Sequence, residues 1–262
     1  MPHDLSVYIS LTSFGAAEVR RHGQEWFTHL SHAAGADGVE VREELLVDAT
    51  HELPALADTL RRLALAGVYS CPTGLWQADG TLDERMLDRA MARTGDLGAT
   101  QLKMSIGGFN AASVATLPLL ARRLAAGGPT LTIENDQTEQ AGTRVALQHF
   151  FDATDAIGLD LPMTFDVGNW HWTGECPQQM AALFAARVRY VHCKGVQRQP
   201  QRWVAVPLAD SAAPWRTIVH AMPTDVPWAI EYPLVGDDLT AVTRTQIDHL
   251  RATARHQQGQ PA

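Results

Sequence analysis

The sequence is poor in cysteine, and its three cysteines form no motif. Cys71, Cys176 and Cys193 are an odd, widely scattered set without CxxC spacing. Secreted disulfide scaffolds instead carry a dense, even-numbered set of cysteines. The composition therefore argues against a disulfide framework and favours reduced thiols in a cytoplasmic protein.

The sequence also lacks a long apolar run, a signal sequence and a basic stripe. No apolar run approaches the roughly 20 residues that a transmembrane helix needs. Residues 1–10 carry no basic segment ahead of their apolar residues, which argues against a signal peptide. The formal net charge is −8, whereas surfaces that bind nucleic acid gather Lys and Arg. Neither a membrane nor a nucleic acid is expected as a partner.

What the sequence does contain is four short apolar strands, each ending on a potential metal ligand. The predicted strands 130–134, 163–166, 189–192 and 228–231 end on Glu134, Asp166, His192 and Glu231. Successive strands lie about one βα unit apart, and the carboxyl ends of parallel strands meet at one rim of a barrel. Carboxylates crowded there repel one another, and a divalent cation is the simplest compensation.

The alternation of side chains along these four strands supports the interpretation. Side chains of a strand point to opposite faces with period two. The face with the ligands otherwise carries small or polar residues and one tyrosine: Thr130, Thr132, Thr164, Tyr190 and Ala229. The opposite face is bulky and apolar: Leu131, Ile133, Met163, Phe165, Val191, Trp228 and Ile230. Strands that are covered by helices outside and face a polar barrel mouth inside have this pattern. One acidic strand end would be a solvated loop start, but four with the same parity favour a shared site.

Four further strands, at 5–11, 38–42, 68–71 and 100–105, alternate with helical patterns in the first half. Eight strand–helix units in succession predict an α/β protein, a single (β/α)8 TIM barrel with a parallel sheet. A doubly wound open sheet is the alternative, but a glycine-rich phosphate turn usually follows its first strand, and residues 12–15 do not supply one. The barrel is predicted over residues 1–255 with no spare strand, residues 196–214 as irregular, and residues 256–262 as a disordered tail.

The donor set indicates the class of metal. Three carboxylates and one imidazole suit Mn²⁺, Mg²⁺ or Co²⁺, and suit Zn²⁺ less because thiolates and further histidines are missing. Four protein ligands leave one or two coordination positions open, as in a catalytic site. One divalent ion is therefore the predicted cofactor, with Mn²⁺ as the first expectation.

In identity, order, spacing and strand-end position, these four residues resemble the ligands of the xylose-isomerase-like TIM barrels, the sugar phosphate isomerase/epimerase family. The resemblance covers essentially the whole chain and is specific for fold and metal rather than for substrate. It implies an enzyme acting on a small-molecule carbohydrate and leaves a homo-oligomer open. In the ketose 3-epimerases the matching glutamates act as a base pair across the sugar, which implies catalytic roles for Glu134 and Glu231. Arg198, six residues after His192, stands where those enzymes carry a substrate-binding arginine.

One position departs from the family pattern. Many members carry a substrate-contacting histidine three residues after the aspartate ligand, where this chain has Asn169, with His171 two residues later. The departure weakens a close match to the known ketose epimerases. The strand ends also carry too few histidines for the three-metal site of the apurinic endonucleases. Asn169 and His171 both remain candidates for substrate binding, His171 as a proton shuttle or simply as polar surface.

Other charged or aromatic side chains are expected at the same rim. Lys103, Lys194 and Glu40 are candidates for binding sugar hydroxyls or a phosphate. For Glu40, an ion pair with Arg42 at the barrel mouth is equally consistent with the sequence. Trp170 follows the aspartate strand, where an indole either stacks on a sugar or packs in the protein.

The predicted reaction is proton abstraction next to a carbonyl through an enediolate, which isomerises or epimerises a sugar, a sugar phosphate or a keto-polyol. Elimination from the same intermediate would instead make the protein a dehydratase or lyase, either inosose-dehydratase-like or C-glycoside-cleaving. A DNA repair protein like the AP endonucleases would bind DNA in a salt-sensitive way. A non-catalytic barrel is the fourth alternative, but it has no reason to gather carboxylates at its rim.

Overall fold

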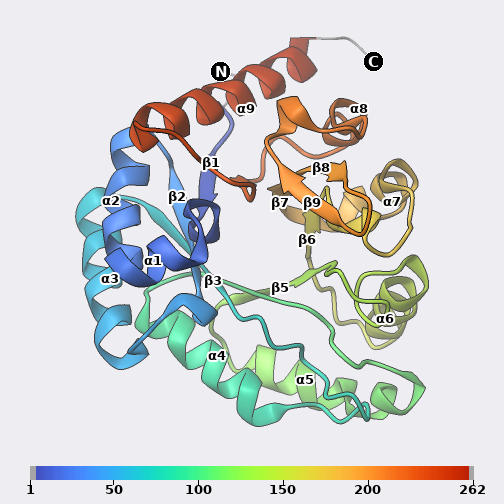
Figure 1. Ribbon diagram of the computed structural model, residues 1–262. Helices are drawn as coiled ribbons and strands as arrows, with labels where there is room; N and C mark the ends of the chain where they lie inside the picture. Colours follow the sequence, from blue (N-terminus) through green and yellow to red (C-terminus); the bar gives the residue numbers. More distant parts are fainter. Residues whose placement is uncertain (1–3, 260–262) are drawn as a thin grey trace.

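Eight parallel strands close into a barrel, as predicted (Figure 1). The computed structural model describes residues 4–259. In spatial order the strands are β1 (Val7–Ser10), β10 (Trp228–Ile230), β7 (Val188–Cys193), β6 (Met163–Asp166), β5 (Thr130–Glu134), β4 (Gln101–Met104), β3 (Ala66–Ser70) and β2 (Gly38–Arg42). The pairing of β1 with both β2 and β10 closes the ring.

Helices surround the barrel as an outer layer (Figure 1). They are α1 (Ala16–His22), α2 (Gln24–Ala34), α3 (Ala49–Leu63), α4 (Glu84–Asp96), α5 (Leu117–Ala125), α6 (Arg144–Ala156), α7 (Pro177–Phe184), α8 (Trp215–Val219) and α9 (Leu239–Gly259). Several begin at side chains that accept a backbone hydrogen bond, such as Asp48 before α3 and Thr143 before α6. Helix α9 packs against α2, which joins the last element of the chain to the first units.

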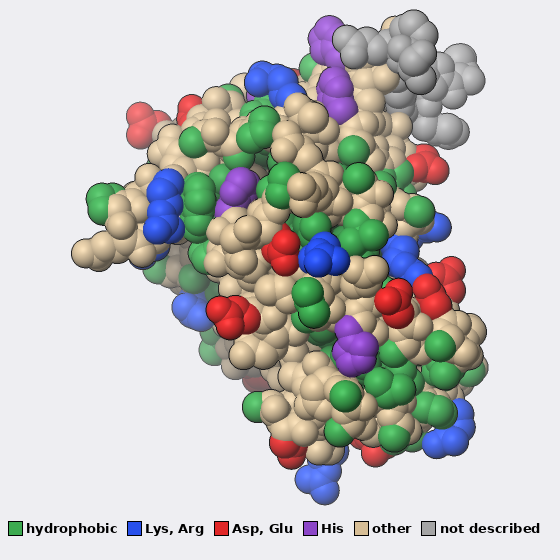
Figure 2. All heavy atoms as spheres, turned by 90° about the vertical axis from the view of Figure 1, so that its right-hand side faces the viewer, with side chains coloured by type: hydrophobic (Ala, Val, Ile, Leu, Met, Phe, Trp, Pro, Cys, Tyr) green, Lys and Arg blue, Asp and Glu red, His purple; other side chains and the backbone are tan. Residues whose placement is uncertain are grey.

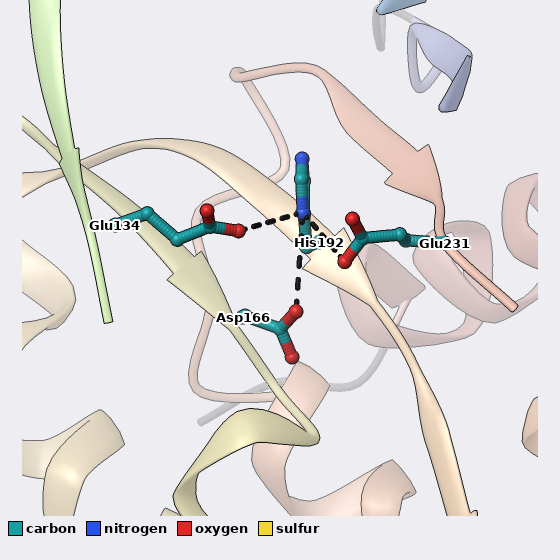
Figure 3. A group of neighbouring side chains, drawn as sticks. All are labelled: Glu134, Asp166, His192 and Glu231. Atoms are coloured by element: carbon teal, nitrogen blue, oxygen red, sulfur yellow. Dashed lines mark hydrogen bonds and ion pairs between the residues drawn. The ribbon is translucent and has the colours of Figure 1, made fainter. Parts of the chain in front are cut away.

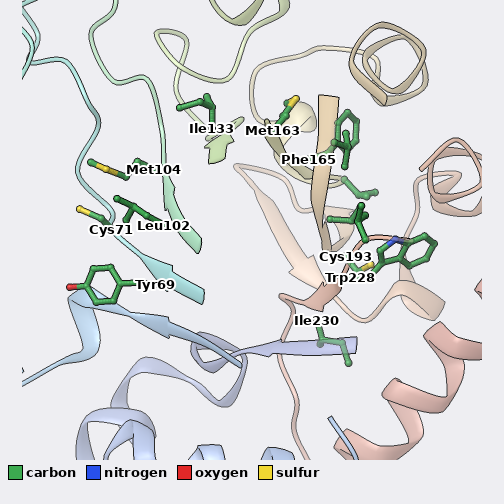
Figure 4. Close-up of a cluster of buried hydrophobic side chains, with 14 of the residues drawn as sticks. Tyr69, Cys71, Leu102, Met104, Ile133, Met163, Phe165, Cys193, Trp228 and Ile230 are labelled. Atoms are coloured by element: carbon green, nitrogen blue, oxygen red, sulfur yellow. The ribbon is translucent and has the colours of Figure 1, made fainter. Parts of the chain in front are cut away.

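The predicted alternation of side chains is confirmed. The bulky residues of the strands point outward and form the main core with the helices, as Figure 4 shows for Ile133, Phe165, Trp228 and others. The opposite face lines a narrow interior, where Val68, Tyr190 and Ala229 form a small separate cluster. Thr164 and Thr132 meet there, with their hydroxyl oxygens 2.9 Å apart. The two faces therefore have the chemistry that a polar barrel mouth requires.

Two predictions about local structure were wrong. Part of the stretch expected to be irregular forms an antiparallel hairpin outside the barrel, β8 (Gly195–Arg198) with β9 (Trp203–Val206). Gly195 permits the pairing, because a Cβ atom there would lie 2.6 Å from the carbonyl oxygens of Val206 and Pro207. The chain also stays helical beyond residue 255.

Helix α9 continues to Gly259, although residues 256–262 were expected to be disordered. The side-chain amide of Gln257 donates to the carbonyl oxygens of His220 and Met222, both at 2.9 Å, and thereby ties this last turn to the end of α8. Residues 260–262 lie outside the described part of the chain.

Over residues 4–259, no helix is both long and apolar enough to cross a membrane. On the face shown in Figure 2, Lys and Arg side chains are spread among acidic and apolar ones rather than gathered in a stripe. This distribution agrees with the negative net charge of the sequence. The expected absence of a nucleic-acid partner stays a prediction.

Candidate metal centre

The four predicted ligands converge at the carboxyl ends of β5, β6, β7 and β10 (Figure 3). One donor atom from each of Glu134, Asp166, His192 and Glu231 lies within 4.8 Å of every other. His192 Nδ1 is 3.0 Å from Glu231 Oε2, 3.1 Å from Glu134 Oε1 and 3.9 Å from Asp166 Oδ2. Donors bonded to one ion at about 2.0–2.2 Å lie at most about 4.4 Å apart. Small side-chain movements would let this set hold a divalent cation.

Each ligand is delivered by an inward position at or next to the end of its strand. Glu231 stands one residue beyond β10, and its backbone N–H donates to the carbonyl of Cys193 on β7 at 3.0 Å. This bond extends the sheet pairing up to the ligand itself. The carboxylate of Asp166 is oriented by the loop that follows it, because its Oδ1 accepts from the backbone N–H groups of Gly168 and Asn169 at 2.8 and 2.9 Å. Its Oδ2 is thereby directed at the cluster.

The loop after β5 supports the same strand end. The side chain of Asn135 brackets Asp166, accepting from its N–H at 2.9 Å and donating to its carbonyl at 3.0 Å. Asn169 in turn donates to the carbonyl of Asn135 at 2.9 Å. Buried amide pairs of this kind hold a local geometry firmly because an unpaired partner would be costly. The sequence did not reveal this role of Asn135.

Every carboxylate ligand is also paired with a cation. Glu134 Oε2 lies 2.6 Å from Lys103 Nζ, and Glu231 Oε1 lies 2.7 Å from Arg42 Nη1. Lys194 Nζ lies 2.7 Å from both Asp166 Oδ2 and Glu231 Oε2. Lys103 and Lys194 are almost completely buried. Charges are tolerated at such depth only when they are paired, so the cations hold the carboxylates together.

The pKa values reflect this pairing. Burial alone would raise the pKa of both glutamates. Lys103 and His192 lower the pKa of Glu134 below its usual value. Lys194 and His192 do the same for Glu231. Asp166 behaves differently, since burial outweighs Lys194 and raises its pKa to about 6. The two glutamates are therefore ionised at neutral pH and able to accept a proton.

Two adjoining cavities open beside the cluster. One of about 280 Å³ is lined by Arg42, Ser70, Ser105, Asn169 and others, and one of about 220 Å³ by Ser13, Tyr232 and others. Gln137, Lys194 and Glu231 line both. Four of these polar lining residues, at or shortly after strand ends, were not predicted from the sequence: Ser70, Ser105, Ser13 and Gln137. A hollow of about 640 Å³ at the opposite end of the barrel contains none of the four ligands.

Two of the seven predicted substrate-binding residues line the cavities, and the other five do not. Lys194 and Asn169 lie at the cavities, with Lys194 Nζ 3.0 Å from Asn169 Oδ1. Lys103 is buried beside Glu134 and lines neither cavity. Glu40 is fully buried against His192, so its predicted contact with substrate is replaced by a contact with a ligand side chain.

Three other candidates lie away from the cavities. The Trp170 ring is completely buried and stacks on Phe184, 6.1 Å between centroids, so it packs in the core instead of facing a sugar. His171 contacts Trp203 of the hairpin, with ring centroids 5.0 Å apart. Arg198 is exposed on β8 with its guanidinium over the same Trp203 ring. The structure does not bring these side chains to the cluster.

Comparison with known proteins gives likeness of structure only. No protein-family model matches the chain, and no curated protein matches its sequence. A "xylose isomerase-like TIM barrel/4-hydroxyphenylpyruvate dioxygenase fusion protein" aligns with a TM-score of 0.75 and 13% identity over 99% of this chain and 45% of that one. This chain thus spans less than half of the fusion protein.

Two further solved structures are matched over nearly their whole length. The probable 3-DHS dehydratase AsbF from Bacillus anthracis has a TM-score of 0.71 and 12% identity, over 94% of this chain and 98% of that one. D-allulose 3-epimerase from Methylomonas sp., solved with D-allulose, has a TM-score of 0.68 and 17% identity over 95% and 98%. The chain therefore has the fold of the xylose isomerase-like TIM barrels, as its strand-end ligands predicted.

Proposed function

We propose that this protein is a divalent-metal-dependent isomerase or epimerase that removes a proton next to the carbonyl of a sugar, a sugar phosphate or a keto-polyol. One observation carries the proposal: two ionised glutamates approach the same point from opposite sides (Figure 3). In each, one oxygen faces the cluster while the other is bound by a cation, Lys103 for Glu134 and Arg42 for Glu231. This arrangement suits two bases that act on opposite faces of one carbon.

The two bases are not equivalent. Glu134 Oε1 forms one ion pair among the described residues, with His192 Nδ1 at 3.1 Å. Glu231 Oε2 contacts both His192 at 3.0 Å and Lys194 at 2.7 Å. The oxygen with fewer cationic contacts is the stronger base, so Glu134 removes the proton. Glu231 delivers to the opposite face a proton that it first takes from the Lys194 ammonium group, 2.7 Å away. Glu134 and Lys194 then exchange protons with solvent, which restores their starting states.

The remaining polar groups bind and orient the substrate. Lys194 reaches both cavities and donates to a substrate oxygen, while Ser70, Ser105 and Asn169 offer hydrogen bonds to hydroxyls along the wall. When bound by the four ligands, a divalent ion, with Mn²⁺ as the first expectation, supplies polarisation of the carbonyl and charge neutralisation of the enediolate. The structural likeness to D-allulose 3-epimerase supports a carbohydrate as substrate.

The test is hydrogen exchange in heavy water. Purified protein with added Mn²⁺ is incubated with a panel of ketoses, sugar phosphates and keto-inositols, and deuterium at the carbon next to the carbonyl is measured by NMR. We expect incorporation by the wild type and a loss of at least about 100-fold in Glu134→Gln and Glu231→Gln, in the range that a general base contributes. Glu139→Gln, an exposed change in the loop after β5, serves as the matched control and should keep full exchange.

The products distinguish an isomerase or epimerase from a dehydratase. A stereoisomer or an aldose–ketose pair supports the proposal, whereas an unsaturated product would identify a dehydratase. Full exchange in either glutamine variant removes that glutamate from the mechanism. No exchange with any member of the panel, in protein that binds the ion, would refute the proposed reaction.

A further inference from the structure

A buried carboxylate that the proposed reaction does not use lies directly behind His192. Glu40, at the inward face of β2, has no exposed surface, and its Oε2 lies 2.7 Å from His192 Nε2. The other ring nitrogen, Nδ1, faces the carboxylate oxygens of Glu231 and Glu134 at 3.0 and 3.1 Å. The imidazole is thus held between Glu40 on one side and the proposed metal ligands on the other.

We propose that Glu40 is a positioning residue of the metal centre, which accepts the Nε2 proton of His192 and so presents the lone pair of Nδ1 to the ion. A neutral imidazole has one N–H group and one lone pair, and the hydrogen bond at one nitrogen determines which of the two faces the metal. This inference rests on the proposed metal site, but not on the reaction carried out there.

Glu40 also connects the imidazole to the cations that hold the two glutamates. Its Oε1 lies 3.0 Å from Arg42 Nη1 and 3.4 Å from Lys103 Nζ. Those cations contact Glu231 at 2.7 Å and Glu134 at 2.6 Å. One carboxylate therefore orients one ligand directly and two others through their counter-ions.

The surroundings of Glu40 fix it in place. Two cations lie beside its Oε1, Arg42 of β2 at 3.0 Å and Lys103 of β4 at 3.4 Å. Ser10 Oγ on β1 adds a longer contact to Oε1 at 3.4 Å. Contacts from β1, β2, β4 and β7 converge on this carboxylate, and it lines neither cavity beside the cluster. Its role is therefore toward the ligands rather than toward a substrate.

The test compares Zn²⁺ affinity, measured by isothermal titration, in Glu40→Gln and Glu44→Gln. Glu44 lies 2.9 Å from Arg42 and is one-third exposed, so its replacement removes the same charge from the same cation without touching His192. We expect Glu40→Gln to weaken Zn²⁺ binding by about 10–100-fold, the usual effect of losing a partner of a ligand histidine. Glu44→Gln should weaken it by no more than about threefold, because exposed charges are screened. Unchanged affinity in Glu40→Gln, or equal weakening in the two variants, would overturn the inference.

A measurement on the wild type keeps the inference testable if Glu40→Gln does not fold. In protein loaded with Zn²⁺, the ¹H–¹⁵N correlations of His192 show which nitrogen is protonated. The inference requires a protonated Nε2 and a metal-bound Nδ1, and the reverse pattern overturns it. Because neither readout depends on turnover, protein that binds Zn²⁺ in this way but exchanges no deuterium would refute the proposed function alone.

Discussion

The glycine two residues after Asp166 should be essential for the position of Lys194, and Gly168→Ala tests this directly. A Cβ atom at Gly168 would lie 2.9 Å from Cγ and 3.0 Å from both Cβ and Cδ of Lys194. These atoms belong to the root and middle of the side chain, so the whole stem must move to make room. The backbone of Gly168, with φ −90° and ψ −35°, is ordinary for alanine. The obstacle to alanine is therefore the clash with Lys194 and not the backbone conformation.

The expected magnitude follows from the contacts that Lys194 would lose. Its ammonium group lies 2.7 Å from Asp166 and Glu231 and 3.0 Å from Asn169. Complete loss of one partner of a buried ion pair costs about 3–5 kcal/mol, and overpacking a tight site costs about 1–3 kcal/mol. Because the stem can relax in part, we expect Gly168→Ala to lower the free energy of unfolding by about 1–3 kcal/mol.

The assay is urea denaturation followed by circular dichroism, with Gly95→Ala as the matched control. Gly95 lies on the exposed side of α4, and a Cβ atom there would meet nothing within 4 Å. Alanine is favoured over glycine in a helix by about 0.5–1 kcal/mol, so the control should be as stable as the wild type or more so. A Gly168→Ala protein that matches or exceeds the stability of the wild type would refute the packing argument.

Three further predictions concern the buried charges. Lys103→Met removes the lysine partner of Glu134 and one of the two cations beside Glu40, at a position that is 2% exposed. It should cost about 3–5 kcal/mol of unfolding free energy, and a loss below about 1 kcal/mol in urea denaturation would contradict this prediction. Removal of metal with a chelator should leave the far-ultraviolet circular dichroism spectrum unchanged, because cations pair the carboxylate ligands and Glu40 pairs His192. Unfolding on chelation would contradict this prediction. Burial lowers the pKa of His192, but Glu40 and Glu231 raise it well above its usual value. A protonated imidazole has no free lone pair, so an ion can bind Nδ1 only after Nδ1 loses its proton. Mn²⁺ affinity measured by titration should therefore rise with pH, about tenfold per unit below the raised pKa, and a pH-independent affinity would exclude this competition.

The ligand set was predictable because each ligand is marked by its own strand. An apolar run with period-two alternation identifies both the strand end and the inward face, as in 130–134 and 163–166. Inward parity also located Lys103, which the structure places 2.6 Å from Glu134. These features are local in sequence, and a closed parallel barrel converts them into a common site.

The role of Glu40 could not be predicted in the same way. Its contact with His192 joins residues 152 positions apart and exists only because the barrel closes. From the sequence, an ion pair and a substrate contact were equally consistent with a charged residue on β2. The structure confirms the ion pair with Arg42, at 3.0 Å, and adds contacts with a ligand histidine and with Lys103 that the sequence did not indicate.

The aromatic residues and the hairpin were missed for a different reason. Trp170 follows a ligand strand, and no periodic pattern decides whether a loop indole faces a cavity or the core. Its stacking on Phe184 of α7 depends on how that helix is placed. The hairpin of β8 and β9 pairs two four-residue strands, which are too short for a clear alternation. Its Trp203 is the ring that contacts both His171 and Arg198.

The most direct test of the central claim is the anomalous diffraction of crystals soaked in Mn²⁺. The account predicts one strong peak at the carboxyl end of the barrel, within about 2.0–2.4 Å of Glu134, Asp166, His192 Nδ1 and Glu231. No peak among these four side chains, or a peak only elsewhere on the molecule, would contradict the account.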